Sequence, residues 1–506
     1  MIPIHSIAQV RAAEEEAFRL VPDGALMQRA ARALSVSCAR LLAEGAGGIV
    51  GSRVVLLVGS GNNGGDALWA GAMLADRGCR VDAVCLSDRV HRKGSRALLR
   101  AGGRLHRWQE GAGPTVSLLD AADLVVDGIL GIGGAGGLRP EAVALVSAVE
   151  ASEAIVVAVD LPSGVDADTG VVAGAAVTAD VTVTFGALKP GLLVAPGRYH
   201  SGAVQLVDIG LEFADEPVAA SLESLDIADW VPEPAEDAYK YRRGVVGVCA
   251  GSRPYPGAAL LVTAAARSAN VGMVRYLDRG DGNAAVVVSH YPDVVVDGQP
   301  PAAQARATGW ACGSGFVGDH ADAAAVEAVL EARVPVVLDA GALSVVADSA
   351  DVRATIADRA ARGLPTVLTP HEGEFERLRP GMLASLGRLD AARDAAVALH
   401  ATIVLKGPGT VIVDPEGTAF VDAEGTADLG TAGSGDVLTG VVAAVLAAAW
   451  TAGRRDCAAF TEATAAAVWL HGRAGRTAAI TAPVTATDIA DAVPAAIRAA
   501  RFGDDA

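Results

Sequence analysis

Val54-Val-Leu-Leu-Val58-Gly-Ser-Gly-Asn-Asn-Gly-Gly-Asp66 is an apolar run that leads directly into a glycine-rich turn ending in an aspartate. A second such turn, Ala432-Gly-Ser-Gly-Asp436, opens the apolar run that starts at Val437. We interpret each turn as the start of a helix, where unpaired backbone N–H groups and the helix dipole favour an anion. Two such turns predict two sites for phosphate-bearing ligands, although a tight strand-to-helix turn would give either pattern alone.

Short Val-rich runs alternate with segments of helical period in both halves of the chain. The predicted strands are 54–58, 81–86, 124–127, 155–160 and 181–185 in the first half, and 244–249, 285–288, 334–339, 366–369 and 402–406 in the second. Strands separated by helices predict an α/β fold with a largely parallel, doubly wound sheet and ligands at the carboxyl ends of the strands. No repeat relates the halves, which predicts two different folds.

Length and composition indicate a two-domain α/β protein. At 506 residues, with 51% apolar and 4% aromatic residues, the chain is too long for one ordinary domain. Residues 211–237 are rich in Pro, Glu and Asp and lack a clear apolar period. We therefore predict domains at 1–212 and 236–506 joined by a linker at 213–235. The net charge of −18 argues against a nucleic-acid partner.

The six cysteines are scattered without a CxxC pair, which favours small core residues in a reducing compartment. The N-terminus shows no basic-then-apolar signal pattern, so we expect a cytoplasmic protein. The longest apolar stretch, 437–450, is short for a membrane span and is flanked by charged residues. We predict a buried helix there and no membrane partner.

Three clusters of the first half follow predicted strands. They are the turn around Asn62, Asn63 and Asp66, the segment Asp127 to Gly137, and Asp160-Leu-Pro-Ser163-Gly-Val-Asp-Ala-Asp-Thr-Gly170. Carboxyl ends of parallel strands share one edge of the sheet, so the clusters should converge on one crevice. Amide, hydroxyl and carboxylate oxygens gathered there could hold a hard cation, whereas helix capping by the same Asp and Ser residues is the simpler alternative.

Together with Phe185-Gly-Ala-Leu-Lys-Pro-Gly191, these motifs resemble the NAD(P)H-hydrate epimerase domain over about residues 1–212. The resemblance implies a Rossmann-like fold and interconversion of the R and S forms of NADH or NADPH hydrated at carbon 6. It implies a potassium site at Asn63, Asp127 and Ser163, with Asp160 as the acid/base group. The implied dinucleotide cradle is Asn62, Asn63, Gly64, Gly65, Asp66, Gly131, Ile132, Gly133, Gly134, Ala135, Gly136 and Gly137.

Departures from the epimerase pattern are Ala67, where the family usually has Gly, and Gln28, where it usually has Glu. Neither lies among the implied ligands. Lys189 could pair with phosphate or with Asp160.

The second half places a cation, a Gly/Thr turn and a helix N-terminus in succession. Thr369-Pro-His371 and Lys406-Gly-Pro-Gly-Thr410 each follow a predicted strand, and Asp436 falls in the first turn of the predicted helix. This set predicts a nucleotide-phosphate site with a base at its edge. A helix-capping role for Asp436 and an ordinary loop position for His371 remain the alternatives.

These motifs resemble the ribokinase superfamily, and within it the NAD(P)H-hydrate dehydratase family, over about residues 236–500. The matching segments are Gly251-Ser252, Tyr255 to Ala259, His290 to Asp293, Gly313 to Gly315, Asp339 to Leu343, Thr369 to His371, Lys406-Gly407 and Gly433 to Asp436. The resemblance implies a ribokinase-like α/β/α fold and phosphorylation of the carbon-6 hydroxyl by ADP with Mg²⁺, followed by loss of phosphate. It implies Asp436 as the base, with AMP and phosphate released.

The implied ligand residues of the second half fall into two groups. Those for the nucleotide are Lys406, Gly407, Pro408, Gly409, Thr410 and Gly435, and those for the hydrate are Ala258, Gly315 and His371. Departures from the family pattern are Asp293 for Glu, Asn270 for Gly and Ala432 for Gly, of which Ala432 would crowd the phosphate most.

The sequence thus predicts a bifunctional repair enzyme acting on the hydrates NADHX and NADPHX, with a homo-oligomer as the family expectation. The alternative is a small-molecule kinase of the hydroxymethylpyrimidine or sugar type with a non-catalytic N-terminal binding module.

Overall fold

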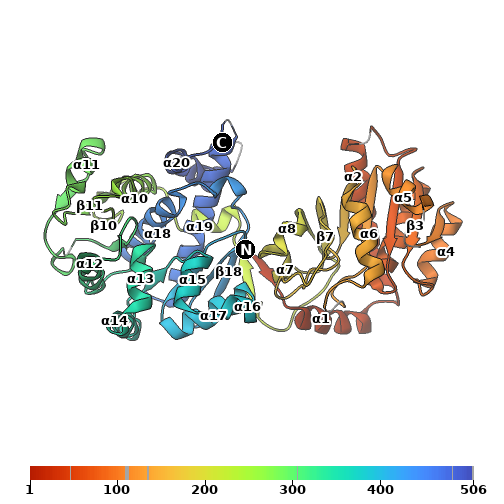
Figure 1. Ribbon diagram of the computed structural model, residues 1–506, viewed down its shortest axis with the longest axis horizontal. Helices are drawn as coiled ribbons and strands as arrows, with labels where there is room; N and C mark the ends of the chain where they lie inside the picture. The colour runs from red at the N-terminus through yellow and green to blue at the C-terminus, as the bar shows by residue number, and fades with distance from the viewer. Residues whose placement is uncertain (46, 109–112, 134–135, 305, 481, 504–506) are drawn as a thin grey trace. The chain divides into compact units, whose positions relative to one another are not determined.

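The computed structural model describes residues 1–506 apart from 46, 109–112, 134–135, 305, 481 and 504–506 (Figure 1). The chain forms two compact units, one of residues 3–218 and one of residues 219–506 together with Met1 and Ile2. The stretch predicted as a linker contains β9 (Ala219–Ser221) and α9 (Ser224–Ala228), which both belong to the second unit.

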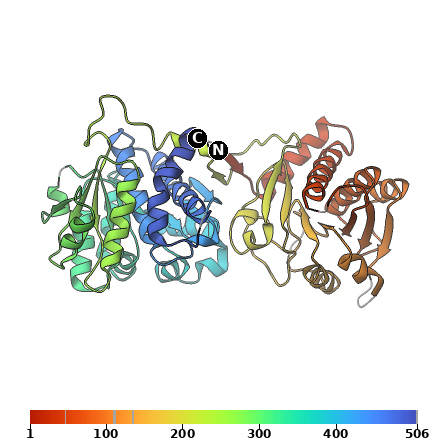
Figure 2. The same ribbon diagram turned by 90° about the horizontal axis from the view of Figure 1, so that it is seen from above.

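The first unit is a seven-stranded parallel sheet with helices on both faces (Figure 2). Its order is β4-β3-β2-β5-β6-β7-β8. The strands are β2 (Arg53–Val58), β3 (Arg80–Cys85), β4 (Arg104–Arg107), β5 (Leu124–Gly128), β6 (Ile155–Val159), β7 (Val181–Phe185) and β8 (Ala203–Val207). The helices are α1 (Ile7–Leu20), α2 (Ala25–Gly45), α3 (Asn62–Asp76), α4 (Arg92–Arg100), α5 (Gly113–Asp120), α6 (Pro140–Glu150), α7 (Pro190–Leu193) and α8 (Arg198–Ser201).

The unbroken apolar run 54–58 has a direct structural cause. Successive side chains of a strand point to opposite faces, and both faces of β2 are covered by helices. Leu56 packs into the core formed with α2, α3 and α4, whereas Leu57 packs into the core formed with α6. A strand buried on both sides therefore has apolar residues at every position.

The second unit is built on an eleven-stranded sheet of order β1-β9-β18-β17-β16-β15-β14-β13-β10-β11-β12. Its strands from β10 to β16 pair in parallel, and β17 and β18 add antiparallel pairs at one side. Besides β9, the strands are β1 (Ile2–Ile4), β10 (Val245–Cys249), β11 (Met273–Leu277), β12 (Val295–Asp297), β13 (Gly309–Cys312), β14 (Val336–Leu338), β15 (Thr366–Leu368), β16 (Thr402–Leu405), β17 (Thr410–Val413) and β18 (Ala419–Asp422).

The helices of the second unit lie on both faces of this sheet (Figure 1). One group, α10, α18, α19 and α20, shares a core with alternate residues of the central strands. Besides α9, the helices are α10 (Pro256–Ser268), α11 (Asn283–His290), α12 (His320–Leu330), α13 (Gly341–Asp348), α14 (Ala350–Ala361), α15 (Glu372–Leu378), α16 (Met382–Leu386), α17 (Arg388–Leu399), α18 (Ser434–Thr451), α19 (Cys457–Ala479) and α20 (Ala486–Phe502).

The predicted doubly wound, largely parallel architecture is confirmed, but one predicted strand is wrong. Residues 285–288 lie in α11, which follows Gly282 in a left-handed conformation with φ of 90°. A run of four apolar residues does not distinguish a strand from a buried helix. The strand of this region is β11, which precedes the helix.

The predicted buried helix at 437–450 is confirmed as part of α18. Within the described residues, α18 is the one helix long and apolar enough to cross a membrane, and 72% of its window is buried inside the protein. Five of the six cysteines are also buried, as predicted for core residues.

Candidate functional site

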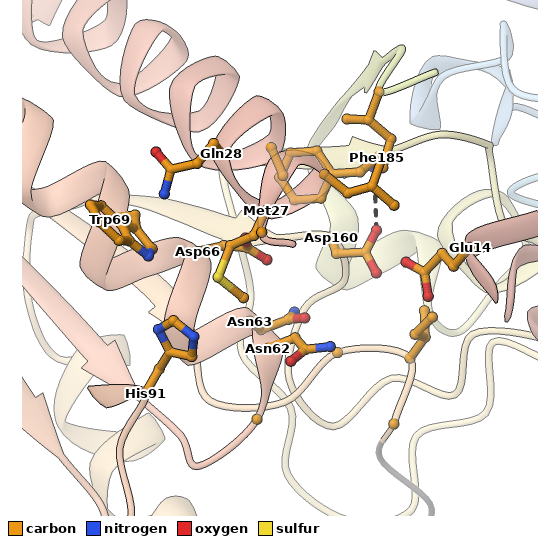
Figure 3. Close-up of a pocket in the computed structure, with 18 of the residues that line it drawn as sticks. Glu14, Met27, Gln28, Asn62, Asn63, Asp66, Trp69, His91, Asp160 and Phe185 are labelled. Carbon is orange, nitrogen blue, oxygen red and sulfur yellow. Dashed lines mark hydrogen bonds between the residues drawn. The ribbon is translucent and has the colours of Figure 1, made fainter. Parts of the chain in front are cut away.

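The three clusters of the first unit meet at one cavity of about 910 Å³ at the carboxyl ends of β2, β5 and β6 (Figure 3). Asn62, Asn63, Asp66, Asp160 and residues 131–133 line it, which confirms the predicted convergence. Gly64, Gly65, Gly136 and Gly137 are not among its lining residues. The predicted cradle residues Gly134 and Ala135 lie outside the described residues.

The predicted potassium ligands gather beside this cavity around a fully buried carboxylate. Asp127 Oδ1 accepts a hydrogen bond from Ser163 Oγ (2.7 Å), and its Oδ2 accepts one from Ser163 N (2.8 Å). Asn63 Nδ2 donates to Val159 O at 2.5 Å and contacts Leu130 O at 3.4 Å. Burial raises the pKa of Asp127 to about 6, although hydrogen bonds from Ser163 oppose the shift.

Two glycines allow the chain to approach this closely. A Cβ on Gly131 would lie 2.2 Å from Asn63 Oδ1, and a Cβ on Gly59 would lie 1.9 Å from Ile129 O. Both contacts are far shorter than van der Waals distance, so any larger residue would displace the oxygen-bearing groups.

Asp160 follows β6 and is held by a buried lysine. Its φ of 66° is in the left-handed region, which costs free energy for a residue other than glycine. Lys189 Nζ donates to Asp160 Oδ1 (2.6 Å), to Thr184 Oγ1 (2.8 Å) and to Phe185 O (3.0 Å). Of the two partners considered for Lys189, the structure therefore shows Asp160.

The site of the second unit lies where loops from its parallel strands meet the N-terminus of α18. Lys406 Nζ, after β16, donates to Asp339 Oδ1 (2.8 Å), and Thr369 Oγ1 donates to the same oxygen (2.8 Å). Glu374 Oε2 lies 3.8 Å from Lys406 Nζ. Burial alone would raise the pKa of Asp339, but Lys406 outweighs it and lowers that pKa.

Asp436 lies in the first turn of α18, as predicted, behind the left-handed Gly433 with φ of 89°. Burial and the nearby Asp339 raise the pKa of Asp436 to about 6. A Cβ on Gly435 would lie 3.3 Å from Lys406 Nζ, so the ammonium group sits against this first turn. The arrangement joins a base, a cation and the N-terminus of a helix, which together suit transfer of a phosphoryl group.

The other predicted ligand residues occupy neighbouring loops. Ala258 and Gly315 adjoin, since a Cβ on Gly315 would lie 2.6 Å from Ala258 Cβ. His371 caps α15, with its Nδ1 accepting from Glu374 N (3.2 Å). The loop from Gly407 through Pro408 and Gly409 to Thr410 is closed by a hydrogen bond from Thr410 Oγ1 to Gly407 O (3.0 Å).

Comparison with known proteins assigns a family to each unit. Residues 246–495 match the family described as NAD(P)H-hydrate dehydratase, and residues 23–191 match the family described as YjeF-related protein N-terminus. The "Bifunctional NAD(P)H-hydrate repair enzyme Nnr" of Mycobacterium tuberculosis is 44% identical over 89% of this chain and 90% of that protein. This chain belongs to the bifunctional NAD(P)H-hydrate repair enzyme family.

Two further relatives each resemble one part of the chain. The "NAD(P)H-hydrate epimerase" of Microbacterium testaceum is 43% identical over 45% of this chain and 86% of that protein. A solved ADP/ATP-dependent NAD(P)H-hydrate dehydratase from Bacillus subtilis, co-crystallised with ATP/Mg²⁺, is 28% identical and has a TM-score of 0.46, covering 56% of this chain and 99% of that chain. As a member of the repair enzyme family, the chain is not described by the alternative of a kinase with a non-catalytic N-terminal module.

One departure of this chain from the family pattern has a structural explanation. Asn270 stands in a left-handed conformation with φ of 66°, where Asn is tolerated better than other residues besides Gly. Its side chain also accepts from Arg243 (2.9 Å) and donates to Pro232 O (3.1 Å).

The sequence analysis of this repair enzyme missed three groups. Asp339 was only part of a motif, yet it anchors Lys406. His471, the lone histidine of the alanine-rich α19, is buried, and its Nε2 donates to Ser434 O (3.0 Å) beneath the first turn of α18. Glu14 of α1 lines the cavity of the first unit. A polar residue on an apolar helix face was the available signal for both His471 and Glu14.

Proposed function

We propose that the two units catalyse successive steps in the repair of NADH and NADPH hydrated at carbon 6, with ADP as the phosphoryl donor. The first unit interconverts the R and S hydrates, and the second dehydrates the S hydrate. One observation carries this assignment most directly: each unit places a carboxylate and a lysine together at the carboxyl ends of its parallel strands, with Lys189 buried and Lys406 largely buried. The proposed substrates are NADHX and NADPHX.

In the second unit, Asp436 is the base that takes the proton of the carbon-6 hydroxyl as its oxygen attacks the β-phosphorus of ADP and AMP leaves. A pKa near 6 suits this role, because the carboxylate is ionised at neutral pH yet more basic than an exposed one. The C–O bond at carbon 6 of the phosphate ester then breaks, a proton leaves carbon 5 to solvent, and the double bond between carbons 5 and 6 forms as inorganic phosphate is released. The amides of Gly433 to Gly435 and the ammonium of Lys406 face the transferred group.

Magnesium would enter this site with the nucleotide. Among the described residues, no group of three or more His, Cys, Asp or Glu side chains could hold a metal ion, whereas Mg²⁺ commonly binds through substrate phosphates. Bound there, the ion would neutralise charge on the phosphoryl oxygens.

In the first unit, Asp160 is the acid/base group, and the donor set around Asp127 fits a potassium ion. Asp127 is fully buried and receives hydrogen bonds from Ser163 and from Ile129 N. The Ser163 hydroxyl joins this carboxylate to Leu130 O, and the Asn63 side chain donates to Val159 O and contacts the same Leu130 carbonyl. Carboxylate, hydroxyl and carbonyl oxygens therefore lie together, with the Asn63 amide beside them. A bound potassium ion would neutralise the carboxylate, and these residues would orient the dinucleotide loop next to it.

The test is the recovery of NADH absorbance from a mixture of R and S hydrates with ADP and Mg²⁺. We expect complete conversion, with one AMP and one phosphate released for each NADH. Asp436→Ala should reduce recovery to background, and Asp160→Asn should stop it near the fraction present as S hydrate. Nucleotide-dependent phosphorylation of the hydrate without phosphate release would contradict the dehydratase assignment. Light scattering of the same preparation would test the expected homo-oligomer.

A further inference from the structure

Helix α1 carries three consecutive glutamates that differ in their surroundings. The helix starts at a capping box formed by Ser6 and Gln9, and its buried face contains Val10, Ala13 and Ala17. Glu14 shares this face, because it lies four residues after Val10 and three before Ala17. Glu15 and Glu16 are exposed. The fold therefore turns one carboxyl of the three inward.

Glu14 faces the epimerase cavity. Its side chain lines the same cavity as Asp160 and Lys189, and Figure 3 shows its carboxyl turned toward that of Asp160. One helical turn earlier, Arg11 donates to Ile132 O at 2.8 Å, which fastens α1 to the loop after β5. Glu14 itself makes no hydrogen bond or ion pair with the described residues, so its carboxyl is available to a ligand.

Lys189, the buried cation of the cavity, is paired with Asp160. All three protons of the Lys189 ammonium are donated within the protein. The three hydrogen bonds that Asp160 accepts all go to Oδ1, from Lys189, Thr184 and Phe185. Within the described residues Oδ2 receives none and is left to the cavity. The charge of the Asp160 carboxylate is thus balanced by the ammonium group of Lys189, whereas Glu14 has no such partner among the described residues.

The surroundings of Glu14 favour its neutral form. Burial and the charge of Asp160 raise its pKa, while Lys189 and Arg11 oppose the shift. Asp66, on α3, also faces this cavity, and burial followed by the charges of Asp160 and Glu14 raises its pKa well above the usual value. Two carboxyls with such different partners, one paired with Lys189 and one unpaired among the described residues, can act as a base and an acid in one site.

We propose that Glu14 is a second proton-transfer residue of the epimerase site, acting as the acid while Asp160 acts as the base. The inference rests on the proposed epimerase function of this unit. Inversion at carbon 6 can proceed by departure of the hydroxyl and return of water to the other side of the ring. The first event needs a proton donor and the second a proton acceptor.

The inversion consumes and returns one water molecule and one proton. Glu14 gives its proton to the carbon-6 hydroxyl, the C–O bond breaks, and the ring nitrogen lone pair forms a C=N bond as water leaves. Water then adds to the opposite side of carbon 6, and the electrons of the C=N bond return to nitrogen. Asp160 Oδ2 takes the proton lost by this water. The proton returns from Asp160 to Glu14 through water, and the reverse reaction follows the same steps.

The decisive variant is Glu14→Gln in the full chain, with Glu15→Gln as the matched control on the exposed side of the same helix. We expect Glu14→Gln to slow epimerisation by about 10²- to 10⁴-fold, measured as loss of R hydrate by chromatography. Glu15→Gln should retain the wild-type rate. Dehydration of purified S hydrate with ADP should be unchanged in both variants, which would show that the second unit is unaffected. The thermal transition of the first unit should stay in place in both variants, which would show that this unit is folded.

Three readouts separate proton transfer from a structural role. The wild-type rate should fall at high pH as Glu14 loses its proton, and this limb should be absent from the residual activity of Glu14→Gln. Glu14→Asp should recover part of the rate. In water labelled with ¹⁸O, each inversion should place the label at carbon 6.

Failure of the proposed epimerase function and failure of the proposed role of Glu14 give different results. A wild-type chain that does not epimerise would remove the proposed function itself. A wild-type chain that does epimerise, with Glu14→Gln at the same rate or inversion without ¹⁸O uptake, would overturn the role of Glu14 alone.

Discussion

Replacement of Lys189 by methionine should destabilise the first unit strongly, because it leaves the buried carboxylate of Asp160 without its cationic partner. Lys189 is 1% exposed and lies 2.6 Å from Asp160, whose side chain is 9% exposed. After the change, Asp160 Oδ1 would keep only the neutral donors of Thr184 and Phe185. Removing one partner of a buried ion pair costs about 3 to 5 kcal/mol. For a domain of this size that corresponds to a lowering of Tm by roughly 6 to 20 °C.

The matched control is Lys93→Met in the same unit. Lys93 pairs with Asp23 at 2.7 Å, nearly the distance of the buried pair, but these side chains are 72% and 88% exposed. Solvent screens such a pair, so this change should leave the thermal transition essentially in place. The two variants differ mainly in burial, which isolates the effect of desolvation.

Differential scanning calorimetry of the full chain can follow the transition of each unit. The losses of Lys189→Met and Asp160→Asn should not be additive, since both act on one pair. Equal shifts for Lys189→Met and Lys93→Met would refute the reasoning, as would full additivity with Asp160→Asn.

Three other outcomes follow from the sites. The dehydratase rate should fall about tenfold per pH unit below pH 6, as Asp436 becomes protonated; a flat profile at saturating ADP would contradict its role as base. Gly131→Ala, which puts a Cβ 2.2 Å from Asn63 Oδ1, should reduce epimerisation on the order of 100-fold and spare dehydration. His471→Leu removes the hydrogen bond to Ser434 O, so the second unit should lose about 1 to 3 kcal/mol of stability. The KM for ADP should also rise, because this bond supports the first turn of α18. An unchanged KM would show that His471 acts only in packing.

The sequence predicted where candidate site residues lie when those residues follow strand ends. Polar residues and glycines that follow an apolar strand lie at the carboxyl edge of a parallel sheet, and the clusters that contain Asn63, Asp127 and Asp160 were located from that rule. Asp436 was located by a different signal, the glycine-rich turn that opens an apolar helix.

Contacts between distant segments could not be predicted in the same way. The pairing of Asp339 with Lys406 joins residues 67 positions apart, and the direction of Glu14 depends on how α1 packs over the cavity. The wrong strand at 285–288 has another cause, since its valines favour β structure locally while tertiary packing places them in α11.

The position of α1 has a practical consequence for dissecting this enzyme. The matched region of the first unit, residues 23–191, omits α1, with Arg11 and Glu14, and also omits β8 at the sheet edge. A fragment cut at those limits would lose one wall of the epimerase cavity and expose the β7 edge. Its inactivity would reflect the cut and say nothing about the native site. Complementation between such a fragment and a synthetic α1 peptide would reveal how much of the active site is supplied by these fourteen residues.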